Sequence, residues 1–150
     1  MGLIADLPPG PIAIDTSVFI HFIEEHPRFL PQVLPLFVAA DAGERTLVTS
    51  AVTLLEVLVV PYRAGNTRVA KQYERLLTGS RGVQLIDLNR DQLRAAAQLR
   101  AVTGAKTPDA LQLVAALSGG CKAFVTNDRR LPSIPGLQIV QLSSYATASS

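Results

Sequence analysis

Short apolar runs alternate with longer helical patterns along the whole chain. The runs typical of buried strands cover residues 11–14, 47–49, 83–88, 123–126 and 137–142. Such alternation of strands and helices is typical of a parallel sheet that is covered by helices on both faces. We therefore predict an α/β three-layer sandwich, in which helices flank a central parallel sheet of about five strands.

Residues that start and stop helices place the helical segments more closely. The first helix should begin near Thr16, and a helix or helix pair should occupy residues 29–42, bent or begun near Pro35 because proline interrupts the hydrogen-bond ladder. Further helices should follow four N-cap residues and end near four glycines. These residues are Ser50, Asn66, Asn89 and Thr107 for the starts, and Gly43, Gly79, Gly104 and Gly119 for the ends.

The length of 150 residues suits one domain, with a core over about residues 11–142 and a small polar tail, 143–150, that we expect to fray. The single cysteine, Cys121, excludes an internal disulfide, and no basic-then-apolar leader precedes the first strand. The apolar stretch from Ala51 to Val60 carries Glu56 and is about half a bilayer span, so it predicts a core helix. We expect a cytoplasmic protein with no membrane role.

Four carboxylates lie on or beside the most apolar stretches of the chain. Asp15 and Asp128 each follow an apolar strand, Glu56 interrupts the run from Leu54 to Val60, and Asp109 lies in the first turn of an apolar helix. Burying a lone carboxylate costs several kcal/mol or more, so four such groups need a common counter-charge. Oxygen ligands of this kind suit Mg²⁺ or Mn²⁺.

Each acid also has an ordinary explanation when it is taken alone. Asp15 could cap a helix, Asp109 could favour a helix dipole, Asp128 could belong to a turn, and Glu56 could simply be exposed. If the first strand is central, however, Asp15 and Asp128 end neighbouring strands, which is where doubly wound sheets bind ligands. Their joint occurrence at one edge of the predicted sheet favours a shared site.

The charge balance argues only weakly for nucleic acid, because the formal net charge is +2. Setting aside the four candidate ligands, which a metal would neutralise, leaves eight acidic residues against 14 basic ones. Most of the basic residues are arginines, whose planar guanidinium suits phosphate contacts. A solvated surface that keeps the protein soluble explains any single arginine equally well.

The acids and their neighbours together resemble the four acidic motifs of the PIN domain. The motifs are Asp15-Thr16-Ser17 after a strand, Glu56 within a helix, Lys106-Thr107-Pro108-Asp109-Ala110 at a helix start, and Thr126-Asn127-Asp128 after a later strand. Each motif is weak alone, whereas the ordered set with its spacing is a strong signal. The resemblance covers roughly residues 11–142 and is closest to the VapC-type toxins of toxin–antitoxin pairs.

This resemblance implies a Mg²⁺- or Mn²⁺-dependent endoribonuclease that cleaves tRNA, rRNA or mRNA and so inhibits translation. It carries the catalytic and metal-binding roles to Asp15, Glu56, Asp109 and Asp128, with Ser17 and Thr126 as supporting polar groups. Lys106, Arg129 and Arg130 are candidate RNA contacts. The implied partners are a small cognate antitoxin of the VapB type and a second copy of the chain, in a homodimer.

Other functions have less support in the sequence. A phosphoaspartyl phosphatase needs a second aspartate at position 17, which is Ser17, and a dinucleotide-binding domain needs a glycine-rich turn after its first strand. His21 and His26 have no partner histidine or cysteine at metal spacing, which argues against zinc. The remaining alternative is a non-catalytic PIN-like protein that binds RNA or a partner.

The density of phenylalanine in the first two predicted helices suggests an interface. Phe19, Phe22, Phe29 and Phe37 are more apolar rings than one small core readily absorbs, so we expect some of them to be exposed. We expect both a homodimer surface and an antitoxin groove there. The alternative is that all four rings point inward.

Overall fold

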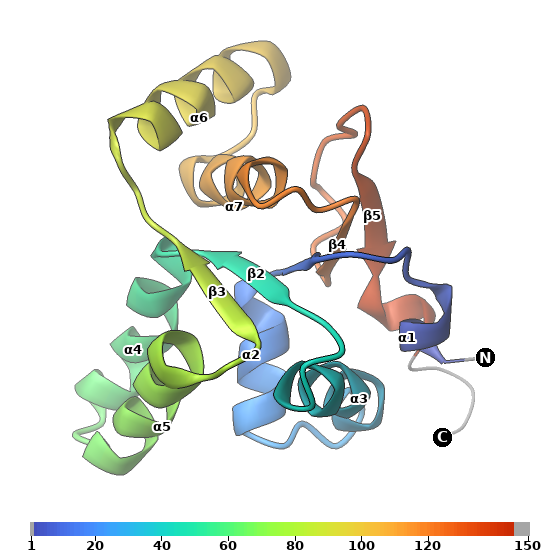
Figure 1. The fold of residues 1–150 in the computed structure, drawn as a ribbon. Helices are drawn as coiled ribbons and strands as arrows, with labels where there is room; N and C mark the ends of the chain where they lie inside the picture. Colours follow the sequence, from blue (N-terminus) through green and yellow to red (C-terminus); the bar gives the residue numbers. More distant parts are fainter. Residues whose placement is uncertain (1, 146–150) are drawn as a thin grey trace.

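The computed structural model describes residues 2–145, and it confirms the predicted α/β sandwich (Figure 1). Five strands form one sheet in the order β3-β2-β1-β4-β5, and every neighbouring pair is parallel. The strands are β1 (Ile12–Ile14), β2 (Leu47–Ser50), β3 (Val83–Ile86), β4 (Ala123–Thr126) and β5 (Gln138–Gln141). The central position of β1 makes β4 its neighbour, as the hypothesis of a shared site requires.

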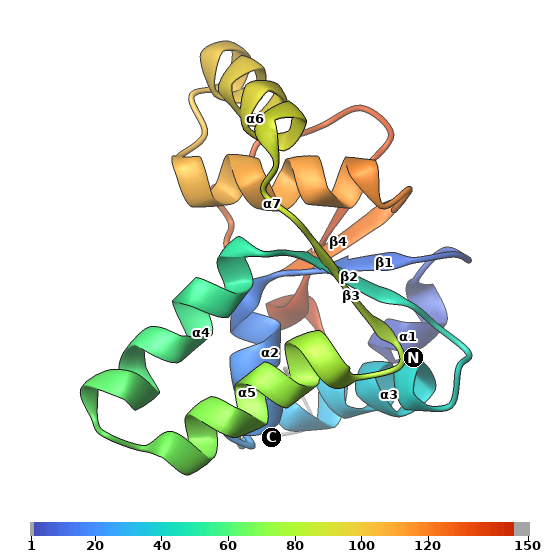
Figure 2. The ribbon, with the colours of Figure 1, turned by 60° about the vertical axis from the view of Figure 1, so that its left-hand side comes forward.

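Seven α-helices in the described residues cover the two faces of the sheet. They are α1 (Leu3–Asp6), α2 (Thr16–Ile23), α3 (Leu30–Asp41), α4 (Val52–Arg63), α5 (Thr67–Gly79), α6 (Arg90–Thr103) and α7 (Thr107–Ser118). Figure 2 shows α6 and α7 on one face and α2 to α5 on the other. A short 3-10 helix, Leu142–Ser144, follows β5.

Alternation along the strands divides the core into two layers. Ala13, Val48 and Phe124 pack against Leu113 and Ala116 of α7. On the opposite face, the strand residues join the larger cluster under α2, α3 and α5. These strand residues are Ile12, Ile14, Leu47, Ala123 and Val125. The named strand residues on both faces are buried. This explains why the strands are continuous apolar runs in the sequence, as expected for a parallel sheet covered on both faces.

The order of the strands creates a switch point between β1 and β4. The chain builds β1, β2 and β3 outward in one direction and then crosses back to place β4 and β5 on the other side of β1. Connections therefore leave the carboxyl ends of β1 and β4 on opposite faces, which opens a crevice between them. Asp15 follows β1 directly, and Asp128 lies two residues beyond β4.

The predicted helix boundaries hold in most places and fail in a few. Asn66 and Asn89 are N-caps whose side chains accept hydrogen bonds from the backbone, as predicted. Thr107 is not an N-cap: Lys106 occupies that position, and the Thr107 hydroxyl accepts a hydrogen bond from Arg100. The first helix, α1, was not predicted because four residues carry too little periodicity.

One further boundary differs by one residue, and α3 is a single helix. Ala51 is the N-cap of α4, while the Ser50 hydroxyl accepts a hydrogen bond from the Val52 N–H. The predicted end of α5 is confirmed, since Gly79 is its last residue. Pro35 lies inside α3, and the helix runs through it unbroken from Leu30 to Asp41.

The prediction of exposed phenylalanines is wrong for Phe19, Phe29 and Phe37, which are buried, whereas Phe22 is partly buried. The rings pack on one another, and Phe22 stacks on Phe37 with 4.0 Å between the ring centroids. The exposed apolar residues of α3 are instead Leu34 and Val38.

The prediction that α4 is a core helix holds for one side of the helix, where Thr53, Val57 and Pro61 are buried, and fails for the other side. Leu55, Val59 and Tyr62 recur at intervals of four and three residues, and they are 65%, 40% and 58% exposed. This spacing places them along one side of the helix. A run of apolar residues does not reveal which side of a helix is covered.

The expected polar tail begins later than residue 143. Ser143 and Ser144 belong to the 3-10 helix, and Tyr145 packs against the main core while its hydroxyl donates a hydrogen bond to Asp6 (2.8 Å). The rest of the predicted tail, residues 146–150, lies outside the described residues. Within residues 2–145, no helix is both long and apolar enough to cross a bilayer.

A close backbone approach before β3 yields a stability prediction. A Cβ atom added at Gly82 would lie 2.6 Å from the Ala40 carbonyl carbon, whereas one added at Gly79 meets nothing within 4 Å. We expect Gly82→Ala to destabilise the protein by about 1–3 kcal/mol, since backbone must move. Gly79→Ala is the matched control and should be neutral or stabilising by up to about 1 kcal/mol. Urea denaturation of both variants measures the difference; equal midpoints would contradict the close approach.

Candidate active site

Asp15 is positioned by the end of β1 and the start of α2. It is the N-cap of α2, and its Oδ1 accepts a hydrogen bond from the Thr16 N–H (2.7 Å). Its Oδ2 accepts a hydrogen bond from the Thr126 hydroxyl at the end of β4 (2.6 Å). Asp15 is therefore both a helix cap and a link between the two central strands, so the capping and functional explanations are not exclusive.

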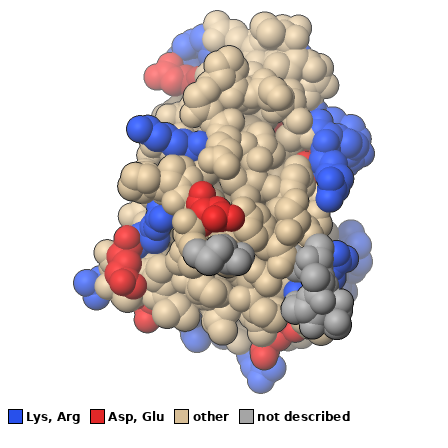
Figure 3. All heavy atoms as spheres, turned by 90° about the vertical axis from the view of Figure 1, so that its right-hand side faces the viewer, with Lys and Arg blue, Asp and Glu red and all other residues tan. Residues whose placement is uncertain are grey.

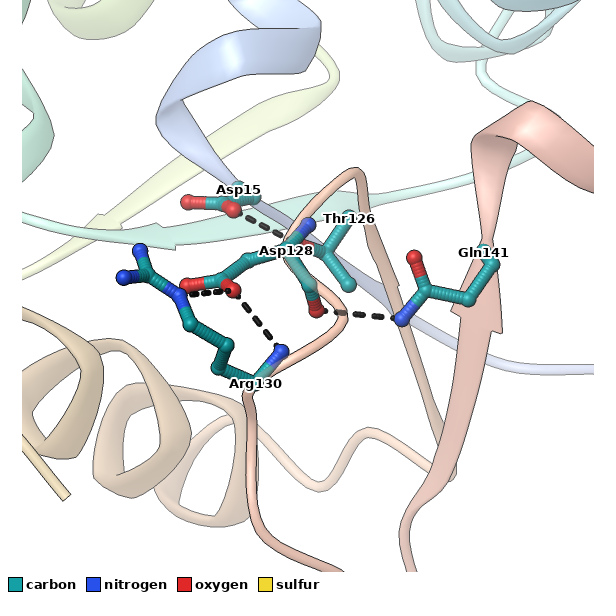
Figure 4. A network of polar contacts seen from close by, with 5 residues as sticks. All are labelled: Asp15, Thr126, Asp128, Arg130 and Gln141. Atoms are coloured by element: carbon teal, nitrogen blue, oxygen red, sulfur yellow. Dashed lines mark hydrogen bonds and ion pairs between the residues drawn. The ribbon is translucent and has the colours of Figure 1, made fainter.

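Thr126 also fixes the loop that carries Asp128. The Asp128 N–H donates to the Thr126 hydroxyl (2.9 Å), and the Gln141 side chain donates to the Asp128 carbonyl (3.0 Å). Figure 4 shows the Asp15 and Asp128 side chains pointing to the same side, with Thr126 hydrogen-bonded to Asp15. Thr126 therefore contacts both acid-bearing segments, and its supporting role in the site stays a prediction.

Asp128 is held by its neighbour Arg130. The Asp128 Oδ1 accepts hydrogen bonds from the Arg130 N–H (2.9 Å) and the Arg130 Nε–H (3.2 Å) (Figure 4). The backbone hydrogen bond from Arg130 is the main cause that lowers the pKa of Asp128 below its ordinary value. Asp128 therefore keeps its charge more easily than an ordinary aspartate does.

Burial acts in the opposite direction on Asp15 and Asp109. Burial is the main cause that raises the pKa of Asp15, and the negative charges of Glu56 and Asp128 raise it further against its two hydrogen bonds. Burial also raises the pKa of Asp109, followed by the charges of Asp128 and Asp15, while Arg130 and Lys106 oppose the shift. Asp15 and Asp109 therefore each lie close enough to other predicted acids for the charges of those acids to raise their pKa values.

Glu56 reaches the site through a hydrogen bond that sequence analysis did not anticipate. Its Oε1 accepts a hydrogen bond from the Thr16 hydroxyl (2.6 Å). That hydroxyl in turn contacts Thr53 and Gln112, which belong to a buried polar network with Thr49 and Ser50. The sequence signal for this network was a glutamine inside an otherwise apolar helix.

Two of the four acids, Asp15 and Asp128, border an open pocket of about 530 Å³, whereas Glu56 and Asp109 do not line it. The other lining residues are Ser17, Asn127, Arg129 and Arg130. The Ser17 Oγ and Asn127 Oδ1 atoms are buried and have no hydrogen-bond partner. Buried polar atoms rarely remain unpaired, so such atoms beside a pocket suggest a ligand. With the carboxylates they form an all-oxygen donor set, which fits Mg²⁺ or Mn²⁺ and does not fit zinc.

The carboxylates do not form a closed coordination cage as they stand. Within residues 2–145, no three Asp, Glu, His or Cys side chains converge closely enough to hold a metal ion. Three of the four acids already accept hydrogen bonds: Asp15 from Thr16 and Thr126, Glu56 from Thr16, and Asp128 from Arg130. Binding a cation here would require at least the Asp128–Arg130 contact to rearrange.

The predicted RNA contacts differ in their surroundings. Arg129 donates a hydrogen bond to the Ser143 hydroxyl (2.8 Å), and Arg130 covers Asp128. The positive charge of Lys106 opposes the rise in the pKa of Asp109 and adds to the lowering of the pKa of Asp128. His21 lies behind the pocket with its Nε2 atom 2.8 Å from the Asn127 amide nitrogen, so it orients Asn127.

A comparison with protein families finds one match, to the model of the PIN domain, over residues 12–137. Among solved structures, a chain of the VapBC2 complex of Rickettsia felis bound to promoter DNA is similar, with a TM-score of 0.67 and 18% identity. That alignment covers 87% of this chain and 98% of the other.

Two structures from Mycobacterium tuberculosis are also similar. VapC20, described as a Sarcin–Ricin loop cleaving toxin, has a TM-score of 0.65 and 16% identity, covering 80% of this chain and 92% of its own. The VapBC-5 structure has a TM-score of 0.55 and 24% identity, covering 89% and 99%. Such low identities establish a shared fold. No curated protein matches the chain in sequence.

The raised pKa of Asp109 predicts how its replacement changes stability. Asp109→Asn should increase the free energy of unfolding of the metal-free protein near pH 7 by a few tenths to about 1 kcal/mol, after allowance for solvent screening. Folding raises the pKa of Asp109 above its ordinary value of 3.8. The contribution of Asp109 to the free energy of unfolding is therefore most favourable below pH 3.8, and it declines as the pH rises through the pKa of the folded protein. The advantage of the variant should therefore grow over that pH range.

The matched control is Asp91→Asn, which also replaces a first-turn helix acid. The Asp91 side chain is 87% exposed and pairs with Arg94 (3.1 Å), so the change should be neutral or slightly destabilising. Urea denaturation in a chelator between pH 4 and pH 8 measures both variants. If Asp109→Asn lost about 1 kcal/mol instead, Asp109 would act as an ordinary dipole-stabilising acid.

Proposed function

Because the chain belongs to the PIN domain family, we propose that it is a metal-dependent endoribonuclease and the toxin of a toxin–antitoxin pair. The observation that carries this proposal is the oxygen-lined pocket at the carboxyl ends of β1 and β4. The charge of Asp128 raises the pKa of both Asp15 and Asp109. Two buried oxygen atoms that belong to pocket-lining residues, Ser17 Oγ and Asn127 Oδ1, have no hydrogen-bond partner. A purely structural site would satisfy those atoms.

In this proposal Asp15, Glu56, Asp109 and Asp128 hold Mg²⁺ or Mn²⁺. A bound cation would supply an activated water and neutralise the charge that develops on a phosphate. Thr126 orients Asp15 by donating to its Oδ2, and Thr16 orients Glu56 in the same way. Both Asp15 oxygens accept one hydrogen bond each, from the Thr16 N–H and the Thr126 hydroxyl, so a cation would bind through their remaining lone pairs.

The cationic residues at the rim suit a phosphodiester substrate. Arg129 and Arg130 line the pocket. The positive charge of Lys106 favours the ionised forms of Asp109 and Asp128. In our proposal Arg130 exchanges its contact with Asp128 for a phosphate oxygen when RNA and metal bind. Elsewhere the surface is not uniformly basic: the face that carries α1 and β5 is mostly uncharged, with Lys and Arg gathered toward its edges (Figure 3).

We infer that the substrate is RNA of the translation machinery, either tRNA, rRNA or mRNA. VapC20, which shares the fold, is described as cleaving the Sarcin–Ricin loop, and this supports an RNA target for the present chain. Cleavage of such an RNA would inhibit translation in the cytosol. The single cysteine, Cys121, is free and buried, which is in keeping with a reducing compartment.

A small antitoxin of the VapB type is the proposed protein partner. Several similar structures are toxin–antitoxin complexes. The present chain has an apolar groove of about 400 Å³ between α2, α3 and α5, lined among others by Phe22, Leu34, Val38 and Leu76. A groove of this kind accepts the apolar side of a helix or an extended segment. We propose that the antitoxin binds there.

A homodimer is proposed on a different surface. The exposed row on α4, formed by Leu55, Val59 and Tyr62, is apolar and lies along one side of the helix. Monomeric proteins seldom expose such rows, and a second copy of the chain would cover it. The phenylalanines of the first two helices have no part in this interface, since they serve the core.

A non-catalytic PIN protein remains the second candidate, favoured by one observation. The carboxylates form no ready coordination cage in the described residues, and Arg130 occupies Asp128. A protein that used these charges only to bind RNA or a partner would show the same arrangement. Bound metal without RNA cleavage would identify this alternative.

Metal-dependent cleavage is the central test of the proposal. We expect the antitoxin-free protein to cleave structured RNA with Mg²⁺ or Mn²⁺, to stop with a chelator, and not to be rescued by zinc. Asp15→Asn and Asp128→Asn should each reduce the rate by about 100-fold or more, because each removes a metal ligand. Asp91→Asn is the control and should keep full activity. Cleavage that persists in a chelator would contradict the metal mechanism.

The two proposed interfaces can be separated by one substitution in each. Leu55→Glu on α4 should convert a dimer to a monomer, while Leu34→Glu in the groove should keep the dimer and lose the antitoxin. A buried charge at either surface costs several kcal/mol, enough to weaken either contact by about 100-fold or more. Light scattering and co-purification with the antitoxin measure the two effects. If each variant lost both properties, or neither, the assignment of surfaces would be wrong.

A further inference from the structure

Gln112 is a buried polar residue on α7, one turn beyond Asp109. It is 3% exposed and lies among apolar neighbours, Leu111 and Leu113, in the same helix. Its amide forms hydrogen bonds with residues of three other segments, at Thr16, Ser50 and Thr53. Burying an amide is unfavourable unless its partners are satisfied, so this arrangement constrains all the groups that contact it.

The orientation of the Gln112 amide follows from its backbone partner. The Ser50 N–H can only donate, and it lies 3.2 Å from the Gln112 Oε1 atom, so the oxygen must face Ser50. The amide nitrogen therefore faces the other way and donates to the Thr53 hydroxyl (2.6 Å) and the Thr16 hydroxyl (3.2 Å). Rotating the amide by half a turn would place two donors against each other.

This orientation decides the direction of the Thr16 hydroxyl. The Thr16 oxygen receives a hydrogen bond from Gln112, and its own hydrogen is directed to the Glu56 carboxylate, which can only accept when ionised (2.6 Å). Thr53 and Thr49 complete the circuit, since their hydroxyls lie 2.7 Å apart and Thr49 donates back to the Gln112 Oε1 (3.3 Å). Each hydroxyl hydrogen in the circuit then has one assigned acceptor.

The network connects the elements that carry the acids. Thr16 follows Asp15 at the start of α2, Thr53 lies one turn before Glu56 on α4, and Gln112 follows Asp109 on α7. Figures 1 and 2 show α2 and α4 on one face of the sheet and α7 on the other. The hydrogen bonds therefore reach across the carboxyl edge of the sheet, where few apolar contacts can join the two layers.

We propose that Gln112 is a positioning residue for the metal site, acting through Thr16 to hold the Glu56 carboxylate in place beside Asp15. This inference rests on the proposed function, since it assigns Glu56 as a metal ligand. Groups that orient metal ligands typically change metal affinity by 10- to 100-fold when they are removed. Gln112 is not among the residues that line the pocket.

Mn²⁺ binding to RNA-free protein tests the proposal without relying on cleavage. Gln112→Met keeps the volume and removes the amide, and Thr16→Val removes the hydroxyl that Gln112 orients. We expect each to weaken Mn²⁺ binding by about tenfold or more, measured by calorimetry or Mn²⁺ resonance. Because both changes act on the same hydrogen bond, the double variant should bind no more weakly than Thr16→Val alone.

Val114→Ala is the matched control for general loosening of α7. Val114 is also buried on that helix but packs toward α6, so this variant should lose stability and keep the wild-type Mn²⁺ affinity. The proposal is overturned if Gln112→Met binds Mn²⁺ as tightly as wild type does, or if Val114→Ala weakens binding equally. Losses that simply add in the double variant would also overturn it, since they would show independent actions.

Crystal structures of the metal-free proteins separate this proposal from the proposed function. In Gln112→Met the Thr16–Glu56 hydrogen bond should be lost, and its retention would refute the role of Gln112 whatever the metal does. Failure of the wild-type protein to bind Mn²⁺ at millimolar concentration would instead refute the metal-dependent function. If Gln112→Met does not fold, Thr16→Val provides the same two measurements, since a Glu56 side chain that stays in place without the hydroxyl overturns the proposal.

Discussion

The convergence of negative charge at the carboxyl ends of β1 and β4 is the constraint on which the rest of the site depends. Asp15 and Asp109 are penalised both by burial and by neighbouring carboxylates. A folded chain keeps such groups only if hydrogen bonds and cations compensate them. The compensation is visible in the Thr126 hydrogen bond to Asp15 and in the Arg130 contact with Asp128.

This arrangement explains why polar residues are buried so selectively. The buried polar side chains in the described core are Thr49, Ser50, Thr53, Gln112 and Thr126. All of them lie near the carboxyl edge of the sheet, whereas the opposite edge and both faces are filled by apolar residues. The protein thus confines its polar interior to the place where its acids must be held, and the apolar layers supply the rigidity that fixes their spacing.

The exposed apolar surfaces follow from a different feature of the same fold. The α4–α5 pair projects away from the sheet in Figure 2, so one side of α4 has nothing to cover it. The groove between α2, α3 and α5 is lined by residues of all three helices. Neither surface shares a residue with the lining of the acidic pocket, so partner binding and chemistry can use different side chains of one small domain.

The sequence by itself determined the strand and helix alternation, the parallel sheet and the positions of Asp15 and Asp128 after strands, because these depend on local periodicity. Only the tertiary structure decided that these two strands are neighbours, since strand order depends on the packing of the whole sheet. The sequence did not reveal which apolar residues are exposed, such as Leu55, or that the N-cap of α7 is Lys106 and not Thr107. Those outcomes depend on contacts between distant segments. The Gln112 network is the clearest case: its partners lie 59 to 96 residues away, and only the packing of four elements brings them together.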